Sequence, residues 1–170
     1  MKWIFSLLFL LVGSFSFSAP RSFTQSTSTK ELDLKAELTG RDITKMNDDQ
    51  LYSEVLYQYQ RGDTSAMKRA THVMLKKFKK SPHADNALYI LGYSAVEKGR
   101  YAEGLQYFQQ LLRDYPTSNK AVSAEFAKGV AYRNMKLSRL AQKTFYHVQK
   151  KYPGSPESFR AENELKLLVR

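Results

Sequence analysis

Cysteine is absent from the 170 residues, and its absence excludes two ways of holding or attaching the protein. No disulfide can cross-link the fold, so its stability has to come from the packing of side chains. An exported lipoprotein also needs a cysteine at its cleavage site to carry the acyl chains. We therefore expect a protein that is not lipid-anchored by that route.

Patterns for catalysis or metal binding are missing as well. The three histidines, His72, His83 and His147, are dispersed, with no H-x-x-x-H or HExxH motif and no acidic cluster beside them. No serine lies in a G-x-S-x-G elbow, and no glycine-rich loop is placed to hold a phosphate. We expect no enzymatic activity, no metal and no cofactor.

A long hydrophobic run is also lacking, because the apolar stretch at residues 3–12 is too short to span a bilayer. It follows the positive Lys2 and precedes the small and polar residues 13–18, which is the order of a secretory signal peptide. We predict that residues 1–18 are removed by cleavage before Ala19. Cleavage after Ala19 would leave a proline next to the scissile bond, and an uncleaved membrane anchor is the other alternative.

Residues 19–46 are rich in Ser, Thr, Lys, Asp and Glu, with isolated leucines, and are predicted to form a polar linker. Residues 21–29 have no hydrophobic periodicity and are expected to be disordered. Residues 30–38 are compatible with a short helix, because Leu34 and Leu38 lie one turn apart. This helix either packs on the domain that follows or stays mobile.

A helical hairpin is predicted most clearly at residues 86–116. Apolar side chains recur at helical spacing over residues 86–98 and again over residues 101–114. Gly99 permits the positive φ at which the first helix can end and reverse, and Pro116 ends the second helix. Seven places of this hairpin match the tetratricopeptide repeat (TPR) pattern: Leu88, Leu91, Gly92, Ala95, Gly104, Phe108 and Pro116.

The same pattern recurs 37 residues away in both directions. Gly129 and Phe145 fill the places of Gly92 and Phe108 in the next copy, whereas the copy before it is degenerate, with Val55 at the glycine place. We therefore predict an all-α, TPR-like α-solenoid of three helical hairpins plus a C-terminal capping helix. This TPR domain spans residues 47–169, with repeats at about 47–83, 84–120 and 121–155 and the cap at 156–169.

The helix ends are marked by polar caps and by glycines. Asn47 is a good N-cap for the first helix. Gly62 and Gly99 are predicted to end the first helices of the first two hairpins. The third hairpin has Lys136 at this place, so we expect the left-handed conformation at Asn134 instead.

In stacked helical hairpins the first helices line the concave wall. The fifth, ninth and twelfth places of the three repeats form three columns: Tyr52, Tyr89 and Phe126; Leu56, Tyr93 and Val130; Tyr59, Val96 and Arg133. Aromatic and apolar columns side by side predict a groove that binds an extended or helical peptide of a protein partner. The alternative is that the fifth-place aromatics pack between adjacent first helices, as part of the array's own core.

The formal net charge of +11 predicts an acidic partner or surface. A basic patch lies near the end of the first repeat: Lys68, Arg69, Lys76, Lys77, Lys79 and Lys80. Nucleic acid is the usual ligand of such a patch, but an export signal argues against it. Anionic lipid headgroups, an acidic cell-wall polymer or an acidic partner fit an exported protein better, and a merely solvated basic face is the remaining alternative.

The segments PHADNALYILGYSAVEKGRYAEGLQYFQQLLRDYPTS and KYPGSPESFRAENEL together resemble the C-terminal TPR domain of the CpoB (YbgF) family of the Tol–Pal system. The resemblance covers about residues 47–169. It implies a periplasmic adaptor that docks onto Tol-system and peptidoglycan-synthesis proteins during outer-membrane constriction in cell division. Residues 19–46 are too short, and lack the heptads, for the trimerising coiled coil of that family. The outer-membrane assembly lipoprotein BamD also carries such repeats, but the missing cysteine counts against it.

Overall fold

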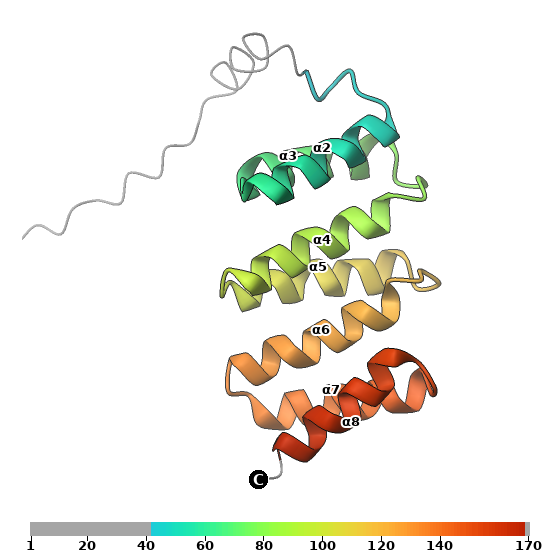
Figure 1. The fold of residues 1–170 in the computed structure, drawn as a ribbon. Coiled ribbons are helices and arrows are strands. Elements are labelled where there is room, and N and C mark those ends of the chain that lie inside the picture. Colours follow the sequence, from blue (N-terminus) through green and yellow to red (C-terminus); the bar gives the residue numbers. More distant parts are fainter. Residues whose placement is uncertain (1–41, 169–170) are drawn as a thin grey trace, which may run out of the picture.

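The computed structural model describes residues 42–168, and every regular element in this range is a helix (Figure 1). The helices are α2 (Asp48–Arg61), α3 (Thr64–Lys77), α4 (Ala84–Glu97), α5 (Tyr101–Asp114), α6 (Ala121–Asn134), α7 (Ser138–Lys151) and α8 (Pro156–Leu168). The predicted all-α, TPR-like class is confirmed, as three hairpins followed by a single helix. The predictions for the signal peptide and for most of the linker concern residues outside this range.

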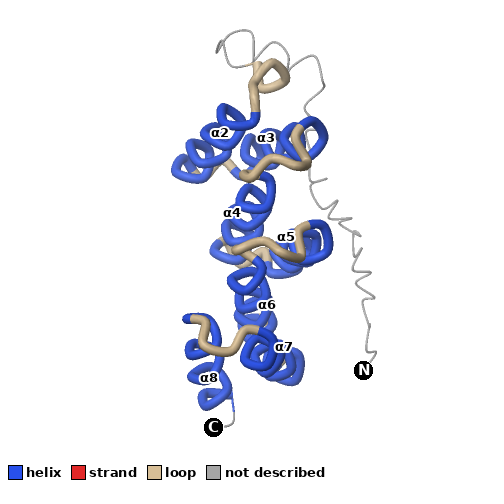
Figure 2. Tube along the Cα trace, turned by 90° about the vertical axis from the view of Figure 1, so that its right-hand side faces the viewer, coloured by secondary structure: helices blue, strands red, loops and turns tan. Residues whose placement is uncertain are grey.

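The three hairpins stack in chain order, and α8 packs against α7 and α6 as the first helix of a further repeat would. Figure 2 shows α2, α4, α6 and α8 on one side of the stack and α3, α5 and α7 on the other. We call the first group the inner wall and the second group the outer row. The inner wall curves inward, because α2 and α8 project further than α4 and α6 between them (Figure 2).

The stacking depends on pairs of glycine and phenylalanine that face each other within a hairpin. A Cβ atom built on Gly92 would lie 2.7 Å from the Phe108 ring, and one built on Gly129 would lie 2.4 Å from the Phe145 ring. A Cβ on Gly104 would lie 2.9 Å from the carbonyl oxygen of Gly92. Gly92 and Gly104 therefore lie where the two helices of the hairpin approach too closely for a side chain.

In the degenerate first repeat, other side chains fill the space between the two helices of the hairpin. Val55 occupies the glycine place and Thr71 the phenylalanine place, and these side chains are 0% and 1% exposed. A larger residue on the first helix is thus matched by a smaller one on the second. Exchanges that conserve volume are the ones that a packed core tolerates best.

The helix ends follow the predicted chemistry in two hairpins and depart from it in the third. Asn47 and Gln50 form a reciprocal capping box at the start of α2. Gly62 and Gly99 adopt φ of 71° and 72°, as predicted. The prediction for the third hairpin is wrong: α6 runs through Asn134, and the left-handed residue is Lys136, with φ of 60°. The backbone hydrogen bonds that close the hairpin require positive φ at that place whatever side chain stands there.

Candidate functional site

The fifth-place aromatic rings contact the start of the next first helix. The Tyr52 ring stacks on His83, the N-cap residue of α4, with 4.6 Å between the ring centroids and 4° between their planes. The Tyr52 hydroxyl also accepts a hydrogen bond from the Asn86 amide. Burial, together with the charge of Asp85, raises the pKa of Tyr52 against the opposing effect of Asn86.

The next two members of this column make equivalent contacts. The Lys120 ammonium, at the N-cap of α6, lies 5.9 Å from the centre of the Tyr89 ring. Phe126 is only 8% exposed, because its ring lies between Phe145 and the Arg160 guanidinium of α8, whose Cζ is 4.8 Å from the ring centre. These contacts favour the alternative in which the fifth-place aromatics join successive first helices.

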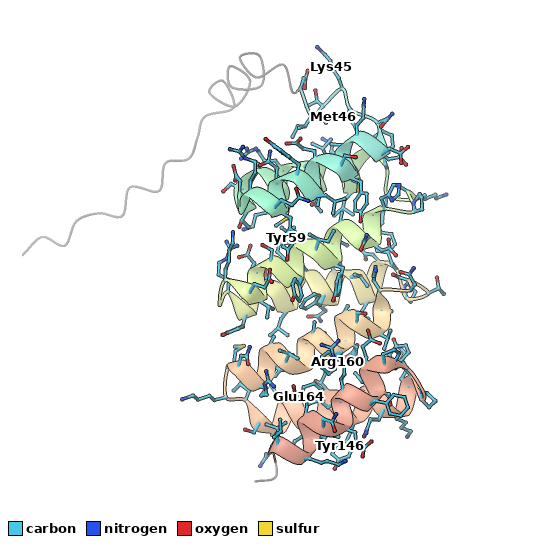
Figure 3. All side chains as sticks on the ribbon, viewed as in Figure 1. Lys45, Met46, Tyr59, Tyr146, Arg160 and Glu164 are labelled. Atoms are coloured by element: carbon cyan, nitrogen blue, oxygen red, sulfur yellow. The ribbon has the colours of Figure 1, made fainter. Side chains whose placement is uncertain are left out.

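The twelfth-place side chains are likewise engaged within the array. The Tyr59 hydroxyl donates a hydrogen bond of 2.9 Å to Glu97 of α4. Burial and then this contact raise the pKa of Tyr59 to about 12. Val96 packs in the hairpin core beside Gly104. Arg133 forms an ion pair with Glu164 of α8, and Figure 3 shows Glu164 at the boundary between α6 and α8.

The ninth-place side chains remain accessible. Leu56 is 36% exposed, Tyr93 is 41% exposed and Val130 is half-buried. Leu167 of α8 lies 37 residues after Val130 and is 60% exposed, so it continues the column onto the cap. Sequence reasoning missed Leu167 because the cap was treated as a closing element. The repeat spacing would have found it. We call Leu56, Tyr93, Val130 and Leu167 the ninth-place column.

Carboxylates of the inner wall accept hydrogen bonds from neutral groups. Besides the Tyr59–Glu97 contact, Ser118 donates to Asp85 over 2.5 Å and Ser123 donates to Glu157 over 2.6 Å. Within residues 42–168, no cationic group lies within ion-pair distance of these three carboxylates. None of these three carboxylates is therefore neutralised by an ion pair within the described range.

Two of the six residues of the predicted basic patch make polar contacts within the fold, and the other four form no ion pair in the described range. Lys68 pairs with Glu103 of α5, and the Lys77 ammonium donates to the Thr44 carbonyl. In the described part of the chain, no carboxylate pairs with the other four: Arg69, Lys76, Lys79 and Lys80. The structure adds basic residues on α7 that sequence reasoning did not single out: Arg139, Lys143, Lys150 and Lys151.

Two features are absent from residues 42–168. No group of three or more histidine, aspartate and glutamate side chains is placed to hold a metal ion. None of the helices described has the length and apolar character needed to cross a membrane.

Stacked helical hairpins with an accessible inner wall define the class of TPR-like helical-repeat proteins. Residues 44–168 match the family described as YfiO, outer membrane lipoprotein, and the chain belongs to this family. A comparison with curated proteins finds no match. Membership in the family points to the cell envelope and to a helical domain of a kind that is typically non-catalytic and binds protein partners.

The family match does not test two finer predictions. It does not address the resemblance to CpoB, which stays a prediction. Its description names lipoproteins, in contrast to our expectation of a protein without a lipid anchor, while these 170 residues contain no cysteine. The expected absence of an anchor stays a prediction as well.

Proposed function

We propose that this protein is a non-enzymatic adaptor of the cell envelope that binds a segment of a protein partner along its inner wall. The ninth-place column carries the proposal, because Leu56, Tyr93 and Leu167 are 36%, 41% and 60% exposed. The neighbouring columns make contacts within the array, so the apolar side chains of this column are what the wall offers to another molecule. Exposed Tyr and Leu in a row suit an apolar face of a peptide.

The charge of the inner wall specifies the partner further. Glu97, Asp85 and Glu157 lie on first helices and have no cationic partner in the described range. A segment with Lys or Arg beside its apolar residues would supply the missing positive charge, and complementary charge fixes the register of binding. The proposed ligand is therefore a cationic, amphipathic protein segment.

A selection from a library of displayed random peptides tests this proposal. We expect the purified protein to select peptides that combine apolar and basic residues. Leu56→Ala combined with Tyr93→Ala should weaken their binding by about tenfold or more, because truncating a buried anchor typically costs more than about 1 kcal/mol. Fluorescence anisotropy measures the affinity, and circular dichroism checks the fold.

Tyr146→Ala is the matched control, because Tyr146 lies on α7 of the outer row and is 60% exposed. It should leave peptide binding unchanged. Selection of acidic peptides, or undiminished binding by the Leu56→Ala, Tyr93→Ala variant, would refute the proposed groove.

The resemblance to CpoB supports a narrower form of the proposal. In this form the protein is periplasmic and not lipid-anchored, and its partners are Tol-system or peptidoglycan-synthesis proteins during outer-membrane constriction. A photo-crosslinking amino acid at Tyr93, introduced in living cells, identifies the partner. Crosslinks to proteins of other systems would reject the narrower form and leave the groove intact.

A further inference from the structure

The outer row carries a charge pattern that the proposed function does not use. α3 and α7 contain four basic residues each and no Asp or Glu. α5 lies between them and has two carboxylates, both of which are engaged within the fold. Glu103 pairs with Lys68 and Arg100. Asp114 pairs with Arg113 beside it. The outer row therefore presents positive charge, opposite to the carboxylates of the inner wall.

Several basic residues of the outer row occupy equivalent places in different repeats. Lys76, Arg113 and Lys150 follow one another at intervals of 37 residues, and all three are exposed. Arg69 and Lys143 share a second place, two repeats apart. Because α3, α5 and α7 stack along one side of the molecule, equivalent places line up across the row (Figure 2). The charge is thus spread over a surface.

Exposed apolar side chains lie among these charges on α7. Leu140 is 43% exposed and Tyr146 is 60% exposed, and they flank Lys143 in the sequence. This combination suits a bilayer surface, because aromatic rings and aliphatic chains enter the headgroup region while lysines keep their ammonium groups at the phosphates. A hydrated acidic polymer has no hydrocarbon layer that could take up the Leu140 side chain.

We propose that the outer row docks onto the surface of an anionic phospholipid bilayer, with α7 supplying the apolar contact. Lys76, Lys143 and Lys150 supply the charge, in place of Lys68, Lys77 and Arg113, which are bound within the fold. In this orientation the inner wall faces away from the bilayer and stays open to a protein partner. The inference is independent of which partner binds there.

Vesicle sedimentation tests the electrostatic part of the proposal. The protein should sediment with vesicles of phosphatidylglycerol and phosphatidylethanolamine, should not sediment with phosphatidylcholine vesicles, and should be released as the salt concentration rises. A lysine close to such a surface contributes about fivefold to partitioning, so Lys76→Gln with Lys150→Gln should weaken binding by about 25-fold. Lys45→Gln with Lys166→Gln removes equal charge elsewhere and should have little effect.

A fluorescent label tests the orientation. The chain contains no cysteine, so a single introduced cysteine accepts a polarity-sensitive dye at one site only. With anionic vesicles, the dye should brighten at Tyr146→Cys and remain unchanged at Tyr93→Cys. Brightening at the inner-wall position, or at both positions equally, would overturn the proposed orientation.

A third measurement separates lipid from polymer. Isolated peptidoglycan sacculi replace the vesicles in the sedimentation assay. Retention by sacculi without binding to anionic vesicles would overturn the proposal and assign the outer row to an acidic polymer. The Lys45→Gln, Lys166→Gln control could also lose as much vesicle binding as the outer-row variant. Binding would then depend only on the net charge of the protein, and the proposed docking surface would be overturned.

Discussion

Glu103 is a partly buried carboxylate that joins two successive repeats through ion pairs. It lies on α5, pairs with Lys68 of α3 and with Arg100, and accepts a hydrogen bond of 3.2 Å from Tyr107. Burial alone would raise the pKa of its carboxyl, but Lys68, Arg100 and Tyr107 hold the pKa below the ordinary value of 4.5. Burial of Tyr107, together with the charge of Glu103, raises the pKa of Tyr107 to about 12.

The lowered pKa predicts how stability depends on pH. Because the folded pKa of Glu103 lies below its unfolded value, its contribution is fully present above about pH 5 and is lost as pH falls through the folded pKa. Glu103→Gln should lower the free energy of unfolding at pH 7 by about 1–3 kcal/mol, since it leaves partly buried cations without their partner. It should also flatten the loss of stability below about pH 5.

Urea denaturation at several pH values provides the measurement. Glu162→Gln is the control, because its ion pair with Lys166 is largely exposed and such pairs contribute about 0–1 kcal/mol. An acid-range slope in the Glu103→Gln variant as steep as that of the unaltered protein would show that Glu103 is not the titrating group.

At the scale of the element, the sequence specifies the hairpins well where a small residue or a cap is obligatory. Gly92 and Gly129 are predictable because each Phe ring needs space on the facing helix. Lys136 shows where this logic ends. Its backbone N–H donates to Arg133 and that of Leu137 donates to Tyr132, both over 2.9 Å, so the hairpin closes by the same pattern of bonds as at Gly99. Nothing in a lysine side chain indicates that closure.

Relieving the left-handed conformation at Lys136 should stabilise the third hairpin. A side chain at φ of 60° is less favourable than glycine by about 1 kcal/mol, so Lys136→Gly should raise the free energy of unfolding by about that amount. The reciprocal change, Gly99→Lys, places a side chain at φ of 72° and should lower it by a similar amount. Denaturant midpoints report both effects, and a destabilised Lys136→Gly variant would contradict the argument.

At the scale of the whole molecule, stacking decides which residues share a surface. The spacing of 37 residues predicts the three inner columns, but their exposure depends on contacts between repeats that periodicity cannot show. Tyr52 and Phe126 became packing residues because their rings reach the start of the next helix. The basic residues of α7 were missed because a search for clusters along the chain finds Lys76 to Lys80 but not Lys150, which stacking places in the same row.

Stacking also determines how the molecule unfolds. Within residues 42–168 the core consists of three clusters. One lies around α6, α7 and α8 and includes Phe145, and another at the opposite end includes Met67. In a linear array each repeat contacts only its neighbours, so a loss of packing at one end acts there first. Phe145→Ala should remove about 3–5 kcal/mol of local packing, because the ring is fully buried.

Hydrogen exchange of the backbone amides, read helix by helix, tests this distribution. In the Phe145→Ala variant, α7 and α8 should lose most of their protection, while α2 and α3 keep protection close to that of the unaltered protein. Met67→Ala, at a site 1% exposed, should produce the reverse pattern. Equal losses in all helices of both variants would mean that the described domain opens as one cooperative unit. In that case the two ends of the stack could not loosen separately when partner or membrane binds.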